Sequence, residues 1–154
     1  MQYGKDDRIL HGTIAAALAS LRHGEIIYVA DAGGQIPDDI GVPVLDLGVA
    51  PGLVSLEQIL PLLRDNGDIE RALVAEEMVE INPEKYTAVV EIFGEHRVTT
   101  TKYRPNMYAI RNVAKLIIRT GDYSVHGNVA LLGGYSSADI KIIRGTEVGD
   151  IEIL

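Results

Sequence analysis

The sequence predicts a single α/β domain, a three-layer αβα sandwich around a mostly parallel sheet. Three observations predict this class. Short apolar runs alternate with segments of helical periodicity, which is typical of strands joined by crossover helices. The 154 residues, 47% of them hydrophobic, suffice for one sizeable core. No stretch with the composition of a linker separates off a second domain.

The N-terminal part predicts a helix followed by two strands. The apolar side chains of residues 13–21 fall on one helical face. Residues 26–30 are too few for a helix and rich in β-branched and aromatic side chains, which predicts a strand buried on both faces. Residues 42–45 predict a short strand, and Pro43 favours an edge position because it lacks the N–H that pairing needs.

The middle of the chain repeats the helix and strand alternation. Ser55 and Gln58 form a capping box that opens a helix to about residue 65, and we expect Pro61 to kink or shorten it. Residues 71–75 predict a third strand. Asn82 is expected to cap a helix over residues 83–93, with Pro83 in its first turn. Gly94 should end that helix.

The last third predicts the remaining strands and a tail. Residues 97–101 fit a strand, and Pro105 can begin a helix that places Tyr108 on its second turn. Two buried strands are expected at 115–118 and 129–132, with a polar loop between them. The tail alternates like a hairpin. We therefore expect a main domain over residues 1–134 and a C-terminal extension over 135–154, packed on that domain or at a subunit interface.

The strongest functional signal lies around the first predicted strand. His23 precedes this strand, Asp31 follows it, and a Gly33-Gly34 loop comes next. In open α/β sheets ligands bind outside the carboxyl ends of the strands, and glycines allow the backbone to approach a ligand closely. The pattern predicts a small-molecule site. Taken alone, His23 also suits a helix terminus, and Asp31 also suits a turn.

A second pair of polar residues, His126 and Asn128, lies at the end of the loop near residue 125. If Gly127-Asn128 begins a strand, alternation puts His126 and Asn128 on the same side, where one ligand meets both. Asn128 also suits a turn that bonds its own backbone.

Composition excludes several functions. The net charge of −8, without a basic run, argues against nucleic acid as a partner. No secretory signal or membrane-spanning run is evident, so we expect a cytoplasmic protein with no membrane partner. The chain has no Cys, and the acidic residues 76–80 have no His at ligand spacing, so they predict a solvated helix start and no metal site. The glycine pairs do not fit a dinucleotide fingerprint, and we expect no cofactor.

Over roughly residues 9–134 the chain resembles the ribose pyranase and fucose mutarotase family. The resemblance rests on His23-Gly24, on Asp31-Ala32-Gly33 with Pro37 following, and on Arg119-Thr120-Gly121-Asp122 leading to Gly127-Asn128. It implies a cofactor-independent α/β enzyme that interconverts sugar ring forms. It also implies a ring-like homo-oligomer whose sites lie between subunits.

The resemblance also implies roles for individual residues. In the family, the residue that matches His23 is the acid/base residue and the one that matches Asp31 binds the sugar, and the ribose branch is more similar to the chain at Asp31-Ala32-Gly33. Arg104, Tyr108 and Asn128 find counterparts in the fucose branch. Taken alone, Arg104 suits a solvated loop and Tyr108 suits packing against Val113 and Leu116.

The chain departs from this family in two places. His126 stands where both branches carry a Tyr, which leaves the sugar identity and part of the acid/base assignment open. The chain also continues for about twenty residues past Gly134.

The chemistry that the resemblance implies needs only proton transfers. Opening a hemiacetal requires a base at the anomeric hydroxyl and an acid at the ring oxygen, and imidazole serves both roles near neutral pH. We therefore expect His23 and Tyr108 to be catalytic, and Asp31, Arg104, His126 and Asn128 to bind the sugar. The alternative is a non-catalytic monosaccharide-binding or sugar-transport accessory protein on the same scaffold.

Overall fold

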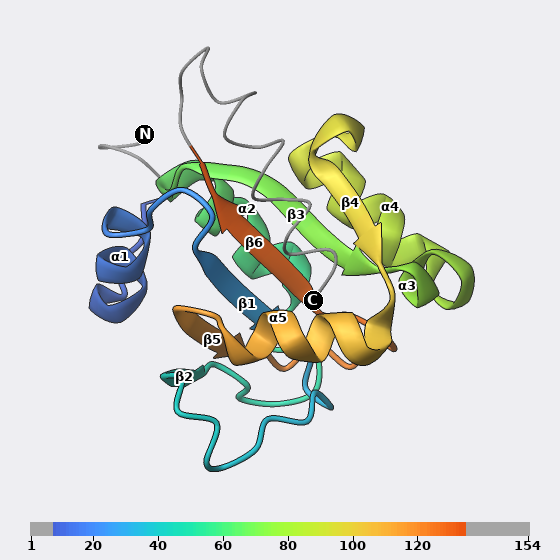
Figure 1. Ribbon diagram of the computed structural model, residues 1–154, viewed down its shortest axis with the longest axis horizontal. Helices are drawn as coiled ribbons and strands as arrows, with labels where there is room; N and C mark the ends of the chain where they lie inside the picture. Colours follow the sequence, from blue (N-terminus) through green and yellow to red (C-terminus); the bar gives the residue numbers. More distant parts are fainter. Residues whose placement is uncertain (1–7, 135–154) are drawn as a thin grey trace.

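The computed structural model describes residues 8–134, which form a six-stranded sheet between helices on both faces (Figure 1). This confirms the predicted αβα architecture. In chain order the elements are α1 (Gly12–Ala19), β1 (Ile26–Ala30), β2 (Val44–Asp46), α2 (Leu56–Asn66), β3 (Ile69–Ala75), α3 (Glu76–Ile81), α4 (Pro83–Phe93), η1 (Glu95–Arg97), β4 (Val98–Thr101), η2 (Tyr103–Met107), α5 (Tyr108–Asn112), β5 (Leu116–Arg119) and β6 (Val129–Gly133).

The strand order is β2-β5-β1-β6-β3-β4. Strands β2, β5 and β1 are parallel to one another, and β3 is parallel to β4. Strand β6 lies between β1 and β3 and runs antiparallel to both (Figure 1). The start of β6 therefore lies at the carboxyl ends of its two neighbours, and its end lies at their amino ends.

Both faces of the sheet are covered by apolar layers. Ile27 and Val29 of β1 point into a core that α1, α2 and α4 cover. Ile26, Tyr28 and Ala30 point to the other face, where α5 and the loop before β2 cover them. All five residues of β1 are buried, which confirms the prediction of a doubly covered strand. Strand β2 lies at the sheet edge, as Pro43 indicated.

Local capping signals predicted two of the helices well. Ser55 and Gln58 form the complete capping box of α2. The Asn82 side chain accepts a hydrogen bond from the Lys85 N–H at the start of α4, and Gly94 ends that helix at φ +89°. The expectation that Pro61 would shorten α2 was wrong, because the helix continues to Asn66. Its buried leucines and isoleucine anchor it on the core, which offsets the one backbone bond that proline removes.

Two other boundaries differ from the predictions. Helix α1 ends at Ala19 and not at residue 21. Tyr108 is the first residue of α5 and does not lie on a second turn. The reason is Arg104, which is extended (φ −114°, ψ 129°) because the following proline disfavours a helical conformation. The segment Tyr103–Met107 consequently forms a wide turn, η2, before the regular helix begins.

The predicted C-terminal extension, 135–154, lies outside the described residues. Within residues 8–134 the longest helices, α2 and α4, have 11 residues each, so none is long enough to cross a bilayer.

Candidate sugar site at the carboxyl edge

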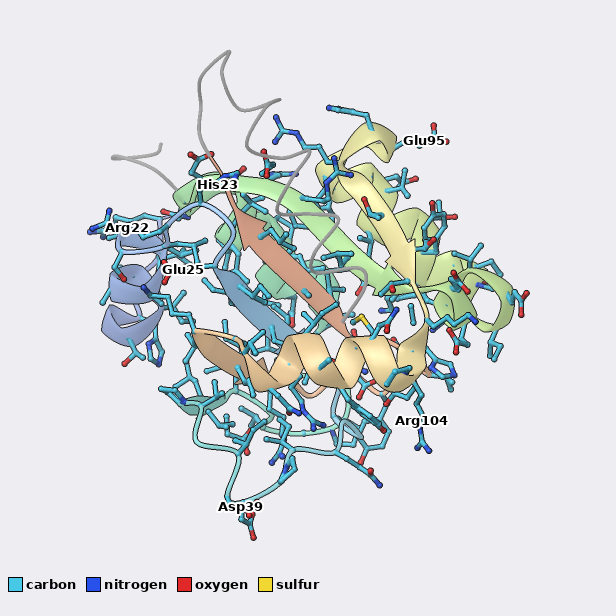
Figure 2. The ribbon with its side chains drawn as sticks, viewed as in Figure 1. Arg22, His23, Glu25, Asp39, Glu95 and Arg104 are labelled. Atoms are coloured by element: carbon cyan, nitrogen blue, oxygen red, sulfur yellow. The ribbon has the colours of Figure 1, made fainter. Side chains whose placement is uncertain are left out.

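His23 and Asp31 lie at opposite ends of β1. His23 precedes the strand, and its side chain, 4% exposed, places Nδ1 4.0 Å from Oε2 of Glu70 near the start of β3. Asp31 directly follows the strand. Strand β1 has five residues, so at a rise of about 3.3 Å per residue its two ends lie roughly 17 Å apart. Figure 2 shows His23 on the opposite side of the molecule from Arg104, which lies beyond β4. One copy of the chain therefore does not bring His23 to Asp31.

Asp31 is locked in place by the residues that open β6. Its backbone N–H donates to Oδ1 of Asn128 at 3.0 Å, and its Oδ2 accepts from the Gly127 N–H at 3.0 Å. Asp31 and Asn128 are 7% and 3% exposed. The two hydrogen bonds are reciprocal, so neither side chain rotates without leaving a buried backbone N–H unsatisfied.

The absence of a side chain at Gly34 permits this arrangement. A Cβ there would lie 3.3 Å from both Oδ1 of Asn128 and the backbone oxygen of Asp31. Gly34 therefore allows the 31–34 loop to approach Asn128. The close approach predicted for the Gly33-Gly34 pair exists, and it involves a side chain of the protein itself.

Burial raises the pKa of Asp31 above its ordinary value. The Gly127 N–H and His126 act in the opposite direction, and Asp122 adds to the rise. His126 has φ +53°, a left-handed conformation that brings its ring edge-on to Tyr103 with the ring centroids 4.9 Å apart. Strand alternation was the wrong reason to group His126 with Asn128, because β6 begins only at Val129. The turn nevertheless places both near Asp31.

Asp122 holds the loop that carries His126 and Asn128. Its carboxylate accepts hydrogen bonds from the Leu56 N–H at 2.9 Å, the Ser124 N–H at 2.9 Å and Nζ of Lys85 at 3.0 Å. Its backbone oxygen accepts from the Ala32 N–H at 2.7 Å. The side chain of Asp122 therefore joins α2, α4 and the loop before β6, and its backbone oxygen joins them to the residue after Asp31.

Burial works to raise the pKa of Asp122, but its hydrogen bonds outweigh burial and lower that pKa. Burial likewise works to lower the pKa of Lys85, and its bonds to Glu57 and Asp122 outweigh this and raise it. At neutral pH both groups are therefore charged.

A group of aromatic and cationic side chains stands beside Asp31 and Asn128. The rings of Tyr103 and Tyr108 lie with their centroids 5.2 Å apart. Arg104, which is exposed, donates from Nη2 to the Tyr108 hydroxyl at 3.3 Å. Arg111 is buried on the same side, with its Cζ 4.7 Å from the centroid of the Tyr108 ring.

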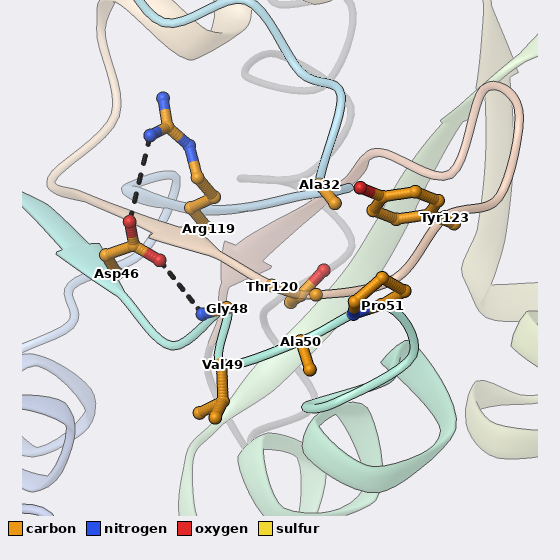
Figure 3. A pocket seen from close by; sticks show the side chains of 10 residues that line it. Ala32, Asp46, Gly48, Val49, Ala50, Pro51, Arg119, Thr120 and Tyr123 are labelled. Carbon is orange, nitrogen blue, oxygen red and sulfur yellow. Dashed lines mark hydrogen bonds and ion pairs between the residues drawn. The ribbon is translucent and has the colours of Figure 1, made fainter.

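Tyr103, Tyr108 and Arg111 line, with the end of β1, a tight crevice of about 180 Å³ that has no room for a water molecule in the single chain. Its lining includes Tyr28, Gly34, Tyr103, Tyr108, Arg111 and Asn128. A second, wider cavity, of about 440 Å³, has Ala32, Asp46 and Arg119 in its lining (Figure 3). There Arg119 and Asp46 pair with each other at 3.8 Å, and the Gly48 N–H donates to Asp46. The charges of this second cavity face one another, whereas the crevice has Arg111 and the Tyr103 and Tyr108 phenols in its lining.

The structure thus brings together five of the six predicted site residues: Asp31, Arg104, Tyr108, His126 and Asn128. His23 is the exception. Packing of Tyr108 against Val113 is not observed, since Val113 is 62% exposed and Tyr108 faces Tyr103 and the two arginines. Within residues 8–134, no three His, Asp or Glu side chains lie close enough together to hold a metal ion.

Sequence reasoning missed Tyr103, Tyr28 and Arg111. Tyr28 was assigned to the core, and its phenol does lie in the apolar layer, where burial raises its pKa. Arg111 sits three residues after Tyr108, a spacing that places both on one helical face and would have indicated the contact. Tyr103 carried no such signal, because it lies before the irregular turn at Arg104.

A family model described as the RbsD / FucU transport protein family matches residues 4–136 of the chain. A D-ribose pyranase of Thermoanaerobacter sp. (strain X514) is 31% identical over 130 residues, which cover 84% of this chain and 97% of the relative.

Solved structures of similar proteins agree with the fold. The structure of Bacillus subtilis RbsD complexed with D-ribose has a TM-score of 0.77 and 29% identity, and the match covers 87% of this chain and 100% of that one. The fucose mutarotase of Streptococcus pneumoniae in complex with L-fucose has a TM-score of 0.70 at 15% identity, over 89% of this chain and 100% of that one. The second likeness shows the fold alone.

The Asp122 network predicts a pH-dependent contribution to stability. Because folding lowers the pKa of Asp122, its contribution is complete above the unfolded pKa and is lost as the pH falls through the folded one. We expect Asp122→Asn to lower the free energy of unfolding by about 3 kcal/mol at pH 7. The deficit should shrink below about pH 4. Urea unfolding at pH 7 and pH 3 measures this.

The control for this experiment is Asp38→Asn, since Asp38 is an exposed loop carboxylate. It should leave stability unchanged at both pH values. An Asp122→Asn deficit of the same size at pH 7 and pH 3 would contradict the role given to the ionised carboxylate.

Proposed function

Because the chain belongs to the RbsD / FucU transport protein family, we propose that it interconverts ring forms of a monosaccharide by opening and closing the sugar ring. The observation that carries the proposal is the buried Asp31, locked by Gly127 and Asn128 beside the crevice of Tyr103, Tyr108 and Arg111 at the carboxyl edge of the sheet. The relatives that are D-ribose pyranases support ribose as the first sugar to test, with fucose as the second.

The reaction consists of two coupled proton transfers. A base takes the proton of the anomeric hydroxyl, and the anomeric C–O bond becomes a carbonyl double bond. The bond to the ring oxygen breaks with its electron pair, and that oxygen takes a proton from an acid. Closure at the same or another hydroxyl reverses these steps and yields the other anomer or ring size. Ring opening already proceeds in water, so positioning and modest acid/base help suffice.

The groups at the carboxyl edge suit this reaction. The carboxylate of Asp31 is an acceptor that can hold sugar hydroxyls and fix the ring. Arg104 and the Asn128 amide group are donors, and the His126 ring lies on the same side. Tyr108 is one of three tyrosines that line the crevice, and its phenol can exchange a proton with the sugar.

We assign the second proton transfer to His23 of another copy of the chain. Within one copy, His23 is at the amino edge and Asp31 at the carboxyl edge, so the two meet only where the edges of two copies face each other. The role requires the imidazole, which is 4% exposed in a single chain, to be uncovered at that contact. This makes a homo-oligomer a requirement of the proposal.

The alternative function is sugar binding without catalysis. The burial of His23 beside Glu70, away from Asp31, favours it. In that case the crevice holds a monosaccharide, and no ring opening is accelerated.

The direct test is saturation-transfer NMR of anomeric protons on ribose, fucose and related sugars with catalytic amounts of protein. We expect faster exchange between ring forms for at least one sugar. His23→Ala should reduce this exchange about 100-fold or more while leaving weak binding. His96→Ala is the matched control, because His96 is exposed in η1 and remote from the crevice. No acceleration with any sugar by folded protein would select the binding-only alternative.

Complementation between two inactive variants tests the shared site. His23→Ala and Asp31→Ala each remove one half of it. If His23 and Asp31 act from different copies, subunits mixed at equal amounts should regain about a quarter of wild-type activity, because one contact in four joins two intact halves. The measurement is exchange NMR after co-refolding. A mixture as inactive as its parents would contradict the assignment of His23 to a neighbouring copy.

A further inference from the structure

Tyr108 is surrounded by two residues to which no role has been given. Tyr103 faces it from η2, with a ring-centroid separation of 5.2 Å. Arg111 faces it from the same helix, α5, with Cζ 4.7 Å from the ring centroid. All three line the crevice together with Asn128.

Arg111 holds a fixed positive charge under the Tyr108 ring. Its guanidinium donates to the backbone oxygen of Gln35 and, at 3.0 and 3.2 Å, to Oδ1 of Asn112. These acceptors are neutral, and among residues 8–134 no carboxylate lies within 4.0 Å of this guanidinium. Arg111 is 7% exposed. A buried cation without an anionic partner interacts strongly with the electrons of an adjacent ring.

Tyr103 lies close enough to Tyr108, with ring centroids 5.2 Å apart, for its hydroxyl to donate to the Tyr108 oxygen. The contact raises the pKa of Tyr103 and lowers that of Tyr108. Burial is the main reason that the pKa of Tyr103 is raised to about 12, and the contact with Tyr108 is the second. Tyr103 therefore keeps its proton at neutral pH and remains a donor.

Other charged groups around the pair act in the same sense. Arg104 donates to the Tyr108 hydroxyl at 3.3 Å and, with Arg111, lowers the pKa of Tyr108, while partial burial opposes them. The Asp31 carboxylate raises the pKa of Tyr103. From β1, the buried Tyr28 phenol faces the same crevice in its neutral form. His126 meets the ring of Tyr103 and not that of Tyr108.

We propose that Tyr103 and Arg111 are positioning residues that prepare Tyr108 to take and return the proton of the sugar. Tyr103 stabilises the Tyr108 oxyanion by a hydrogen bond, and Arg111 stabilises it by its charge. The ionised Tyr108 oxygen accepts the anomeric proton, becomes a phenol, and returns the proton on ring closure. This inference rests on the proposed function, because it gives Tyr108 a substrate proton to move.

The test reads the ionisation of Tyr108 directly. Protein labelled with ¹³C at Cζ of tyrosine is titrated by NMR, and Tyr108→Phe identifies the signal. We expect Tyr108 to titrate below the exposed tyrosines, and its midpoint to move upward in Tyr103→Phe and in Arg111→Gln. Tyr86→Phe is the control, since Tyr86 packs on the opposite face of the sheet. It should change neither the titration of Tyr108 nor activity.

Sugar exchange measured on the same variants gives the second readout. Tyr103→Phe should lower kcat about tenfold near neutral pH, the factor that one pH unit represents, with KM nearly unchanged. The loss should diminish at higher pH, where Tyr108 ionises without help. Arg111→Lys should retain more activity than Arg111→Gln, because it keeps the charge.

The outcomes separate this inference from the proposed function. If wild-type protein accelerates exchange but Tyr103→Phe and Arg111→Gln leave both the titration and kcat unchanged, the inference is overturned. A fall in kcat without movement of the Tyr108 midpoint also overturns it, since the effect would then be structural. If no sugar exchanges faster, the proposed function fails, and the catalytic inference fails with it even when the midpoint moves.

Discussion

The reciprocal pairing of Asp31 with Gly127 and Asn128 is the constraint on which the site depends. Two hydrogen bonds of 3.0 Å join the end of β1 to the residues that open β6, across 97 positions of sequence. They exist because β6 enters the sheet antiparallel between β1 and β3, so its start lies where its neighbours end. Gly34, without a side chain, admits Asn128 to this position. A buried carboxylate is thus held in one orientation at this edge, and carboxylate oxygens are acceptors that suit sugar hydroxyls.

Around this pairing, some charged side chains are neutralised by a partner and others are not. Asp122 is neutralised by Lys85 and by backbone N–H groups, so it fixes the loop before β6 without offering charge to a ligand. Asp46 and Arg119 neutralise each other in the neighbouring cavity. Arg104 and Arg111, in contrast, have no carboxylate partner within residues 8–134, and both contact Tyr108. The positive charges of both arginines therefore lie against a single phenol, and the acid/base role that we propose for Tyr108 rests on this placement.

The sequence predicted the elements well and the site in part, and the difference has a physical basis. The β-branched residues of β1 predicted that both of its faces are buried. Asn82, Pro83 and Gly94 predicted the limits of α4. Both predictions succeeded because these signals act within a few residues. The site depends on contacts between distant segments. His23 and Asp31 flank one strand and appeared to form one site, but the length of the strand separates them. Tyr103 escaped notice because its position follows from the extended Arg104 backbone, which has no periodic signature.

The measurement that tests the account most directly is a titration of ¹⁵N-labelled protein with D-ribose and L-fucose, followed through backbone amide signals. If the carboxyl edge around Asp31 is the sugar site, the amides of Asp31, Gly34, Gly127 and Asn128 will shift together and saturate at one sugar concentration. Amides of Gly48 and Ala50, which line the neighbouring cavity, will move little. Saturable shifts confined to Gly48, Ala50 and Arg119, with Asp31 and Gly127 unmoved, would place the sugar in that cavity and contradict the account.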